Sequence, residues 1–92
     1  MNQVDESVLV MKILCNAHRF AIMQTLFTRK EELCVNQLAE AVGISQSLAS
    51  QQLSYLHARG VIEGHRYGQT ICYVPSDSPL TKTIGKVLKA VA

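Results

Sequence analysis

Two glycines, Gly43 and Gly60, divide the middle of the chain into short segments, and this division constrains the fold more than any other feature. Each glycine follows a run of residues with helical spacing, and glycine suits the left-handed turn after a helix because it has no Cβ to clash. Asn36 and Ser45 precede the two runs, where a side-chain oxygen can accept a bond from an unpaired backbone amide. The pattern predicts two short helices joined by a tight turn, which is a helix-turn-helix.

Beyond Gly60 the apolar spacing changes from that of a helix to that of a strand. The segments VIEGHR and TICYV are rich in β-forming residues, and Tyr67, Gly68 and Gln69 lie between them. This arrangement predicts a β-hairpin. Pro75 ends the second segment because proline has no amide to donate to a neighbouring strand. The predicted fold is therefore mainly α with a β-hairpin wing, a winged helix-turn-helix.

Amphipathic helices are predicted on both sides of this motif. Residues 4–15 and 17–28 show helical spacing on either side of a break at Asn16 and Ala17, and the spacing returns from Leu80 to Val91. The apolar positions of the three segments are Val4, Val8, Met11 and Leu14; Ile22, Met23, Leu26 and Phe27; and Leu80, Ile84, Val87, Leu88 and Val91. We expect residues 1–92 to form a single domain.

Length and composition place the chain among small globular domains. Its 92 residues suffice for one core, and 48% of them are hydrophobic. The amino terminus is acidic and polar, and no apolar run has the length of a membrane span, so neither a signal peptide nor a membrane contact is predicted. Three cysteines without regular spacing argue against a secreted disulfide framework. These features predict a cytoplasmic protein.

The charge is distributed unevenly along the chain. The formal net charge is +2; residues 1–40 carry four basic and five acidic side chains, and residues 41–92 carry five basic and two acidic ones. No acidic residue lies between Gly43 and Gly60. This distribution permits phosphate binding by the later half of the chain without demonstrating it.

The second helix of the predicted motif has the side chains that a DNA-reading helix needs. Its apolar residues can hold it against the core, which leaves short polar residues on the outer side. Glutamine can bond adenine through two hydrogen bonds, and serine can serve a base or a phosphate. Tyr55 is expected beside the sugar-phosphate backbone, and Arg66 and Tyr67 near the hairpin tip suit a wing that touches backbone or minor groove. The outward residues expected to contact DNA are Gln46, Ser47, Ser50 and Gln51.

The sequence resembles the ArsR/SmtB family of bacterial and archaeal repressors. MKILCNAHRFAIMQTL resembles the helix-break-helix segment of that family, and ELCVNQLAEAVGISQSLASQQLSYLHARGVIEGHRYGQTICYV resembles its helix-turn-helix and wing. The resemblance covers roughly residues 8–75. It implies a homodimer built from the first and last helices, which binds an inverted-repeat operator in double-stranded DNA. It also implies repression that an inducer relieves.

The chain departs from the family at its sensor sites. Many metal-sensing members carry ELCVCDL, whereas this segment reads ELCVNQL, with Cys34 kept and Asn36 at the second cysteine position. A lone thiolate is a poor metal site because tetrahedral zinc takes four ligands. The last helix has Asp77 near its start but lacks the His and Glu of a second family site, and the cysteine pair of redox-sensing members is also absent. No metal and no cofactor is predicted, and the sequence does not identify the inducer.

Three cysteines remain to be explained. A free cysteine is most often a small buried hydrophobe, and Cys72, within a predicted strand, suits that role best. Thiol chemistry is the alternative. Cys34 is the best candidate for it, because a helix start lowers the pKa of a thiol, and Cys15 is the second.

Two other functions compete with an inducible repressor. A winged helix can serve as a protein–protein interaction module, and a family member without sensor residues can be a constitutive regulator. An enzyme is disfavoured because the chain has neither a glycine-rich phosphate loop nor paired catalytic carboxylates. The acid-free helix between the two glycines favours DNA binding.

Overall fold

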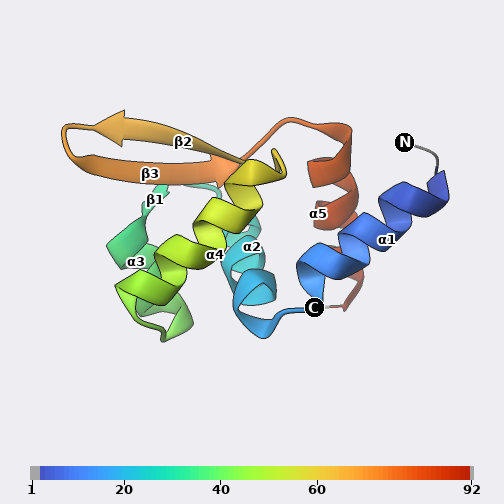
Figure 1. The fold of residues 1–92 in the computed structure, drawn as a ribbon, viewed down its shortest axis with the longest axis horizontal. Coiled ribbons are helices and arrows are strands. Elements are labelled where there is room, and N and C mark those ends of the chain that lie inside the picture. Colours follow the sequence, from blue (N-terminus) through green and yellow to red (C-terminus); the bar gives the residue numbers. More distant parts are fainter. Residues whose placement is uncertain (1–2, 92) are drawn as a thin grey trace.

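The computed structural model describes residues 3–91 as five helices and three short strands (Figure 1). In chain order these are α1 (Gln3–Leu14), α2 (Ala17–Arg29), β1 (Leu33–Cys34), α3 (Val35–Val42), α4 (Gln46–Ala58), β2 (Ile62–Tyr67), β3 (Thr70–Pro75) and α5 (Pro79–Val91). Apart from β1, these are the predicted elements, and they form a winged helix-turn-helix.

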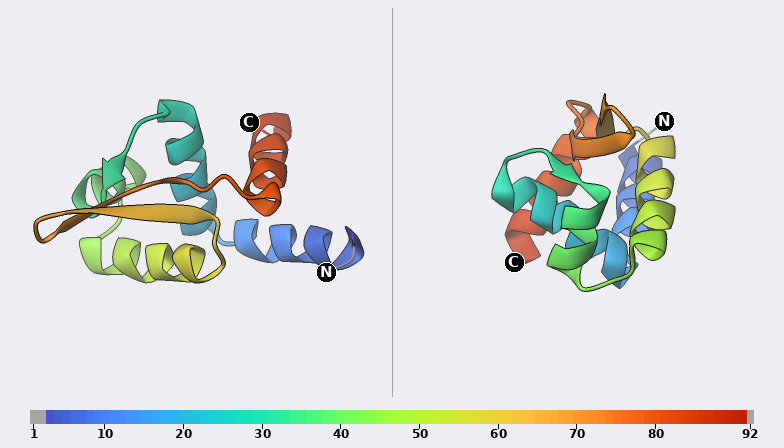
Figure 2. Two further views of the ribbon diagram at one scale, coloured as in Figure 1. Left: turned by 90° about the horizontal axis from the view of Figure 1, so that it is seen from above. Right: turned by 90° about the vertical axis from the view of Figure 1, so that its left-hand side faces the viewer.

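The molecule is elongated, with the hairpin at one end and the terminal helices at the other. Its principal extents are 39 × 23 × 22 Å. Figure 2 shows the β2–β3 hairpin projecting past α3 and α4, while α1 and α5 lie together at the opposite end. No helix within residues 3–91 is long and apolar enough to cross a membrane.

The wing belongs to a three-stranded antiparallel sheet in the order β1-β3-β2. The hairpin pairs from Ile62 with Pro75 to Tyr67 with Thr70, and Gly68 turns the chain at φ +65°. Strand β1 adds only two register pairs to β3, Leu33 with Tyr73 and Cys34 with Cys72. Strand β1 was not predicted, because two residues are too few to show the alternation by which a strand is recognised.

The core surrounds α2, whose predicted inward face is confirmed. Ile22, Met23 and Leu26 are wholly buried, and Phe27 is half-buried. Helix α4 contributes further buried residues from the side that the sequence assigned to the core, namely Ala49, Leu53 and Leu56. Packing on this side orients the rest of α4 outward.

Helix starts are set by capping, and one predicted cap is wrong. Asn16 caps α2 by accepting hydrogen bonds from the amides of His18 and Arg19 at 2.9 and 3.0 Å. Ser45 caps α4 as predicted, accepting from the Leu48 amide at 3.1 Å.

Helix α3 begins at Val35 with Cys34 as its N-cap, so Asn36 is not the cap that the sequence predicted. The side-chain oxygen of Gln37 accepts the Cys34 amide at 2.8 Å. Because Cys34 is already extended and paired with β3, the chain can turn into the helix directly after it, two residues earlier than expected.

The terminal helices divide their apolar residues between the core and the solvent. In α1, Val10 and Ile13 are buried, whereas Val4, Val8 and Met11 are 70%, 46% and 60% exposed. In α5, the predicted apolar positions Ile84 and Leu88 are buried within the chain itself, and Val91 is 62% exposed. The buried apolar residues of α5 therefore pack in the core of their own chain and are not available for a dimer interface.

Candidate nucleic-acid interface

Helix α4 presents a polar, acid-free surface to solvent. The four side chains expected to contact DNA, Gln46, Ser47, Ser50 and Gln51, are all exposed. Their positions follow from the burial of Ala49 and Leu53 on the opposite side of the helix. The helix amino terminus adds partial positive charge at the same end, which favours a phosphate.

Tyr55, the fifth predicted α4 residue, lies between two arginines. The guanidinium carbon of Arg19 is 4.0 Å from the centre of its ring, and that of Arg59 is 3.5 Å away. Tyr55 is half-buried and Arg59 is exposed. Cation–π stacking of this kind holds both guanidiniums beside α4, where their charge suits a phosphate.

Arg19 is not among the predicted site residues. Its Nε donates to the Ile13 carbonyl at 2.9 Å, one Nη donates to the Lys12 carbonyl at 3.0 Å, and the other donates to the side-chain oxygen of Gln52 at 3.1 Å. Arg19 thus ties the end of α1 to α4. The signal available in the sequence was its place in the first turn of α2, three residues after Asn16, near the last α1 carbonyls that need donors.

Arg66 faces a hollow between the wing and α4. This hollow, of about 380 Å³, is lined by Ser54 and His57 of α4 and by Gly64, Arg66, Ile71 and Tyr73 of the hairpin. Arg66 is exposed and forms no ion pair with any residue in 3–91. A free guanidinium beside the reading helix can bind a phosphate or enter a groove.

Tyr67, the second predicted wing residue, is hydrogen-bonded to another side chain of the protein. Its hydroxyl donates to one carboxylate oxygen of Glu32 at 2.6 Å, while Nδ1 of His65 bonds the other. The bonds from Tyr67 and then His65 lower the pKa of Glu32, and the bond to Glu32 raises the pKa of His65 and that of Tyr67. The ring of Tyr67 stays exposed, but its hydroxyl is already bound.

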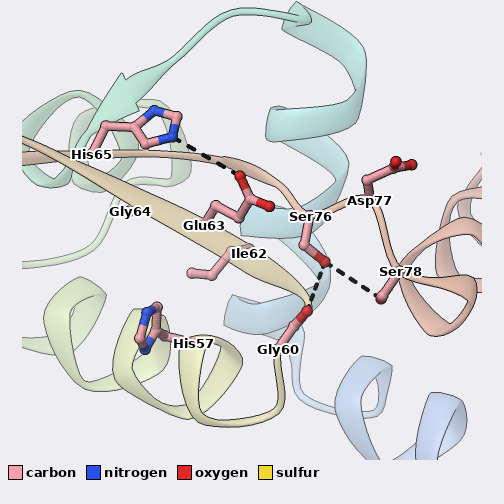
Figure 3. Close-up of a pocket in the computed structure, with 9 residues that line it drawn as sticks. All are labelled: His57, Gly60, Ile62, Glu63, Gly64, His65, Ser76, Asp77 and Ser78. Carbon is pink, nitrogen blue, oxygen red and sulfur yellow. Dashed lines mark hydrogen bonds and ion pairs between the residues drawn. The ribbon is translucent and has the colours of Figure 1, made fainter.

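A second hollow, at the base of the wing, has a different character (Figure 3). Its acidic residues are Glu63, whose carboxylate is 3.9 Å from Nε2 of His65, and Asp77. The Ser76 hydroxyl donates to the Gly60 carbonyl at 2.6 Å and closes the lower end of the hairpin (Figure 3). These two carboxylates make this hollow unfavourable for a phosphate group.

The cysteines differ from the expectation. Cys34 and Cys72 form a disulfide across β1 and β3, so Cys72 is not merely a packing residue. Cys15 is free and exposed. Within residues 3–91, no group of three His, Cys, Asp or Glu side chains is placed to hold a metal ion.

The fold defines a winged-helix protein, in which α4 presents an exposed, polar and acid-free face and the wing carries an exposed Arg66. The chain belongs to the arsR family of bacterial regulatory proteins, whose sequence model matches residues 16–63. It is 40% identical over 72 residues to the nodulation protein NolR of Rhizobium meliloti. That match covers 78% of this chain and 57% of NolR, so the chain spans little more than half the length of this curated relative.

Solved structures show the same architecture. HlyU from Vibrio cholerae superimposes with a TM-score of 0.82 at 26% identity, covering 98% of this chain and 97% of HlyU. The homodimeric winged helix-turn-helix DNA-binding domain of Mb0332 from Mycobacterium bovis gives a TM-score of 0.74 at 26% identity, covering 96% of this chain and 76% of that one.

Proposed function

We propose that this protein is a cytoplasmic transcriptional repressor that binds an inverted repeat in double-stranded DNA as a homodimer. The observation that carries the proposal is the exposed, acid-free face of α4 beside a wing whose Arg66 has no carboxylate partner in the described chain. A surface without negative charge, formed by α4 and Arg66, favours the binding of a polyanion such as DNA. Membership of the arsR family supports the same assignment.

We assign the base contacts to the outward residues of α4 and the backbone contacts to the arginines around it. Gln46 and Gln51 carry amides that can bond base edges, while Ser47 and Ser50 suit bases or phosphates. Arg59, stacked on Tyr55, and Arg66, which shares a hollow with Ser54 and His57 of α4, suit phosphates. Tyr67 stays a predicted contact, made by its exposed ring.

The proposed dimer uses the end of the molecule opposite the wing. Val4, Val8 and Met11 of α1 and Val91 of α5 are apolar and largely exposed there. A patch of this kind on a small domain favours association with a second copy. The homodimeric state of the Mb0332 domain supports the choice.

Fluorescence anisotropy with labelled DNA from upstream of the encoding gene tests the proposal. We expect binding that exceeds binding to a scrambled duplex of equal length and that weakens linearly with the logarithm of salt concentration, because phosphate contacts release counterions. Equal, salt-insensitive or undetectable binding to both duplexes would instead favour a protein–protein interaction module.

A promoter–reporter assay tests the direction of regulation. A dimer that covers a promoter excludes the polymerase, so we expect lower reporter output with the protein than without it. Higher output would make the protein an activator. Output that no added metal, oxidant or metabolite changes would mark a constitutive regulator without a sensor.

A further inference from the structure

The segment just before α3 is bound to the wing at two points. Cys34 is joined to Cys72 of β3 by a disulfide between residues 38 positions apart in the chain. Two residues earlier, Glu32 accepts the Tyr67 hydroxyl at 2.6 Å and bonds His65. The backbone register aligns Cys34, Cys72 and His65 in one row across the three strands. The disulfide is thus the covalent member of a larger contact between this segment and the hairpin.

The disulfide contributes a large part of the attachment of β1 to β3. Strand β1 has only two register pairs, and Cys34 with Cys72 is one of them. An antiparallel pairing as short as this is marginal by itself. Breaking the S–S bond leaves Leu33 with Tyr73 and the Glu32 contacts to hold the wing to this segment.

Cys34 also connects directly to the helix-turn-helix. It is the N-cap of α3, and α3 packs against α4, the proposed reading helix. The bond therefore forms a short covalent path from the wing to the helix pair. Its presence limits how far the hairpin can move relative to α4.

We propose that Cys34 and Cys72 are a reversible thiol–disulfide site through which low-molecular-weight disulfides control the affinity of the proposed repressor for DNA. This inference rests on the proposed function for its effect on DNA, but not for the chemistry. A protein that acts on DNA in the cytoplasm works in a reducing compartment, where disulfides are mostly transient and regulatory. The pair requires no metal and no third cysteine.

The exchange balances with a glutathione disulfide as oxidant. The Cys34 thiolate attacks one sulfur of that disulfide, which forms a mixed disulfide and releases one glutathione thiolate. The Cys72 thiolate then attacks Sγ of Cys34 and releases the second glutathione, and the two protons lost by the cysteines end on the two glutathione thiols. Cys34 acts first because it is half-buried at a helix start, whereas Cys72 is only 6% exposed.

The oxidised form is expected to bind DNA more tightly. The described structure is the oxidised one, and it keeps the winged-helix arrangement of its structural relatives, so the bond does not disrupt the fold. A wing already fixed relative to α4 loses less conformational freedom when both engage DNA. We expect reduction to weaken operator binding about fivefold or more, at the lower end of coupling between sites.

The test equilibrates the whole protein in buffers of graded reduced and oxidised glutathione. Free thiols are then blocked with N-ethylmaleimide and counted by mass, the Cys34–Cys72 peptide pair is identified, and anisotropy on the upstream duplex is measured in each buffer. Cys15→Ser is the matched control and should keep both the titration and the change in affinity. Cys34→Ser and Cys72→Ser should each abolish both, with affinity close to that of the reduced protein.

Three results would overturn the inference. The first is that Cys34 and Cys72 stay disulfide-bonded, or stay reduced, across the whole glutathione range. The second is that the oxidation maps to Cys15. The third is equal operator affinity of the reduced and oxidised forms when both bind. A titrating pair in a protein that binds no DNA in either state would contradict the proposed repressor and leave the exchange site intact, so the two failures are distinguishable.

Discussion

At the scale of single residues, the residues of α4 that we propose to contact DNA differ from those that stabilise the fold. Gln51 is exposed, whereas Leu53, two residues on, is buried. A polar side chain that contacts only solvent adds little to the free energy of folding. Its effect on binding and its effect on stability can therefore be measured apart.

We expect Gln51→Ala to weaken operator binding by about 1–3 kcal/mol, the value of a good amide-to-base contact. Its melting temperature should stay close to that of the wild type, because the side chain is exposed. Anisotropy and thermal denaturation followed by circular dichroism provide the two measurements. Earlier melting with unchanged affinity would mean that α4 is turned the other way.

A second residue-scale prediction concerns the Glu32–His65–Tyr67 contact. The carboxylate of Glu32, with a smaller effect from Glu63, raises the pKa of His65 above its ordinary value of 6.5. The contact therefore contributes stability below pH 6.5 and loses it as the pH rises through the raised pKa. Bonds from Tyr67 and His65 lower the pKa of Glu32 below 4.5, so its share is present above pH 4.5 and is lost as the pH falls through the lowered value.

Glu32→Gln should accordingly lower the pKa of His65 in an NMR titration of its ring protons. Its stability deficit relative to wild type in urea denaturation should be largest between pH 4.5 and 6.5. Glu31→Gln, one residue away and exposed, is the matched control and should leave that pKa unchanged. An unaltered His65 titration in Glu32→Gln would show that the two side chains do not interact in solution.

At the scale of elements, the caps decide where the helices of the motif begin. Ser45 has an extended backbone and accepts the Leu48 amide, whereas Ser47, inside the first turn of α4, is an exposed side chain. The two serines are two residues apart, but only Ser45 caps the helix. They offer a matched pair of substitutions.

Ser45→Ala should cost about 1 kcal/mol of unfolding free energy through the lost cap. In a domain of this size that corresponds to a melting temperature lower by roughly 4–8 °C. The unfolding free energy of Ser47→Ala should lie within about 0.5 kcal/mol of the wild-type value, as is usual for substitutions at exposed positions. Differential scanning calorimetry compares them, and equal melting of the two variants would contradict the assignment of Ser45 as the cap.

At the scale of the whole molecule, the proposed DNA surface and the proposed dimer surface lie at opposite ends (Figure 2). The long axis of 39 Å separates the hairpin tip from the exposed apolar residues of α1. Ile84 cannot test the dimer, because it is wholly buried in its own chain and a charge there would unfold the protein. Met11, which is 60% exposed, is a suitable position for testing the dimer.

We expect Met11→Glu to sediment as a monomer in analytical ultracentrifugation at concentrations where the wild type is dimeric, because a carboxylate would be buried without a partner at the interface. Its far-ultraviolet circular dichroism should be unchanged. Gln69→Glu, which adds the same charge at the exposed hairpin turn, should remain dimeric. A Met11→Glu dimer would place the interface elsewhere.

The sequence alone determined most of the element order and the outward face of α4. These features depend on local physics: glycine after α3 and α4, Ser45 as a cap, and helical or alternating spacing within a few residues. The start of α3 was misplaced, because Asn36 looks like a cap while the pairing of Cys34 with β3 decides where the helix begins. Local patterns carry no information on that pairing.

Only the tertiary structure decided which distant side chains meet. The Cys34–Cys72 bond, the bonds of Glu32 to the wing, and the stacking of Arg19 of α2 on Tyr55 of α4 join residues from different elements. The buried hydroxyl of Thr81 likewise donates to the Val61 carbonyl, 20 residues away in the chain, at 3.3 Å. Such contacts depend on how helices and strands pack in space, and sequence spacing by itself does not specify that packing.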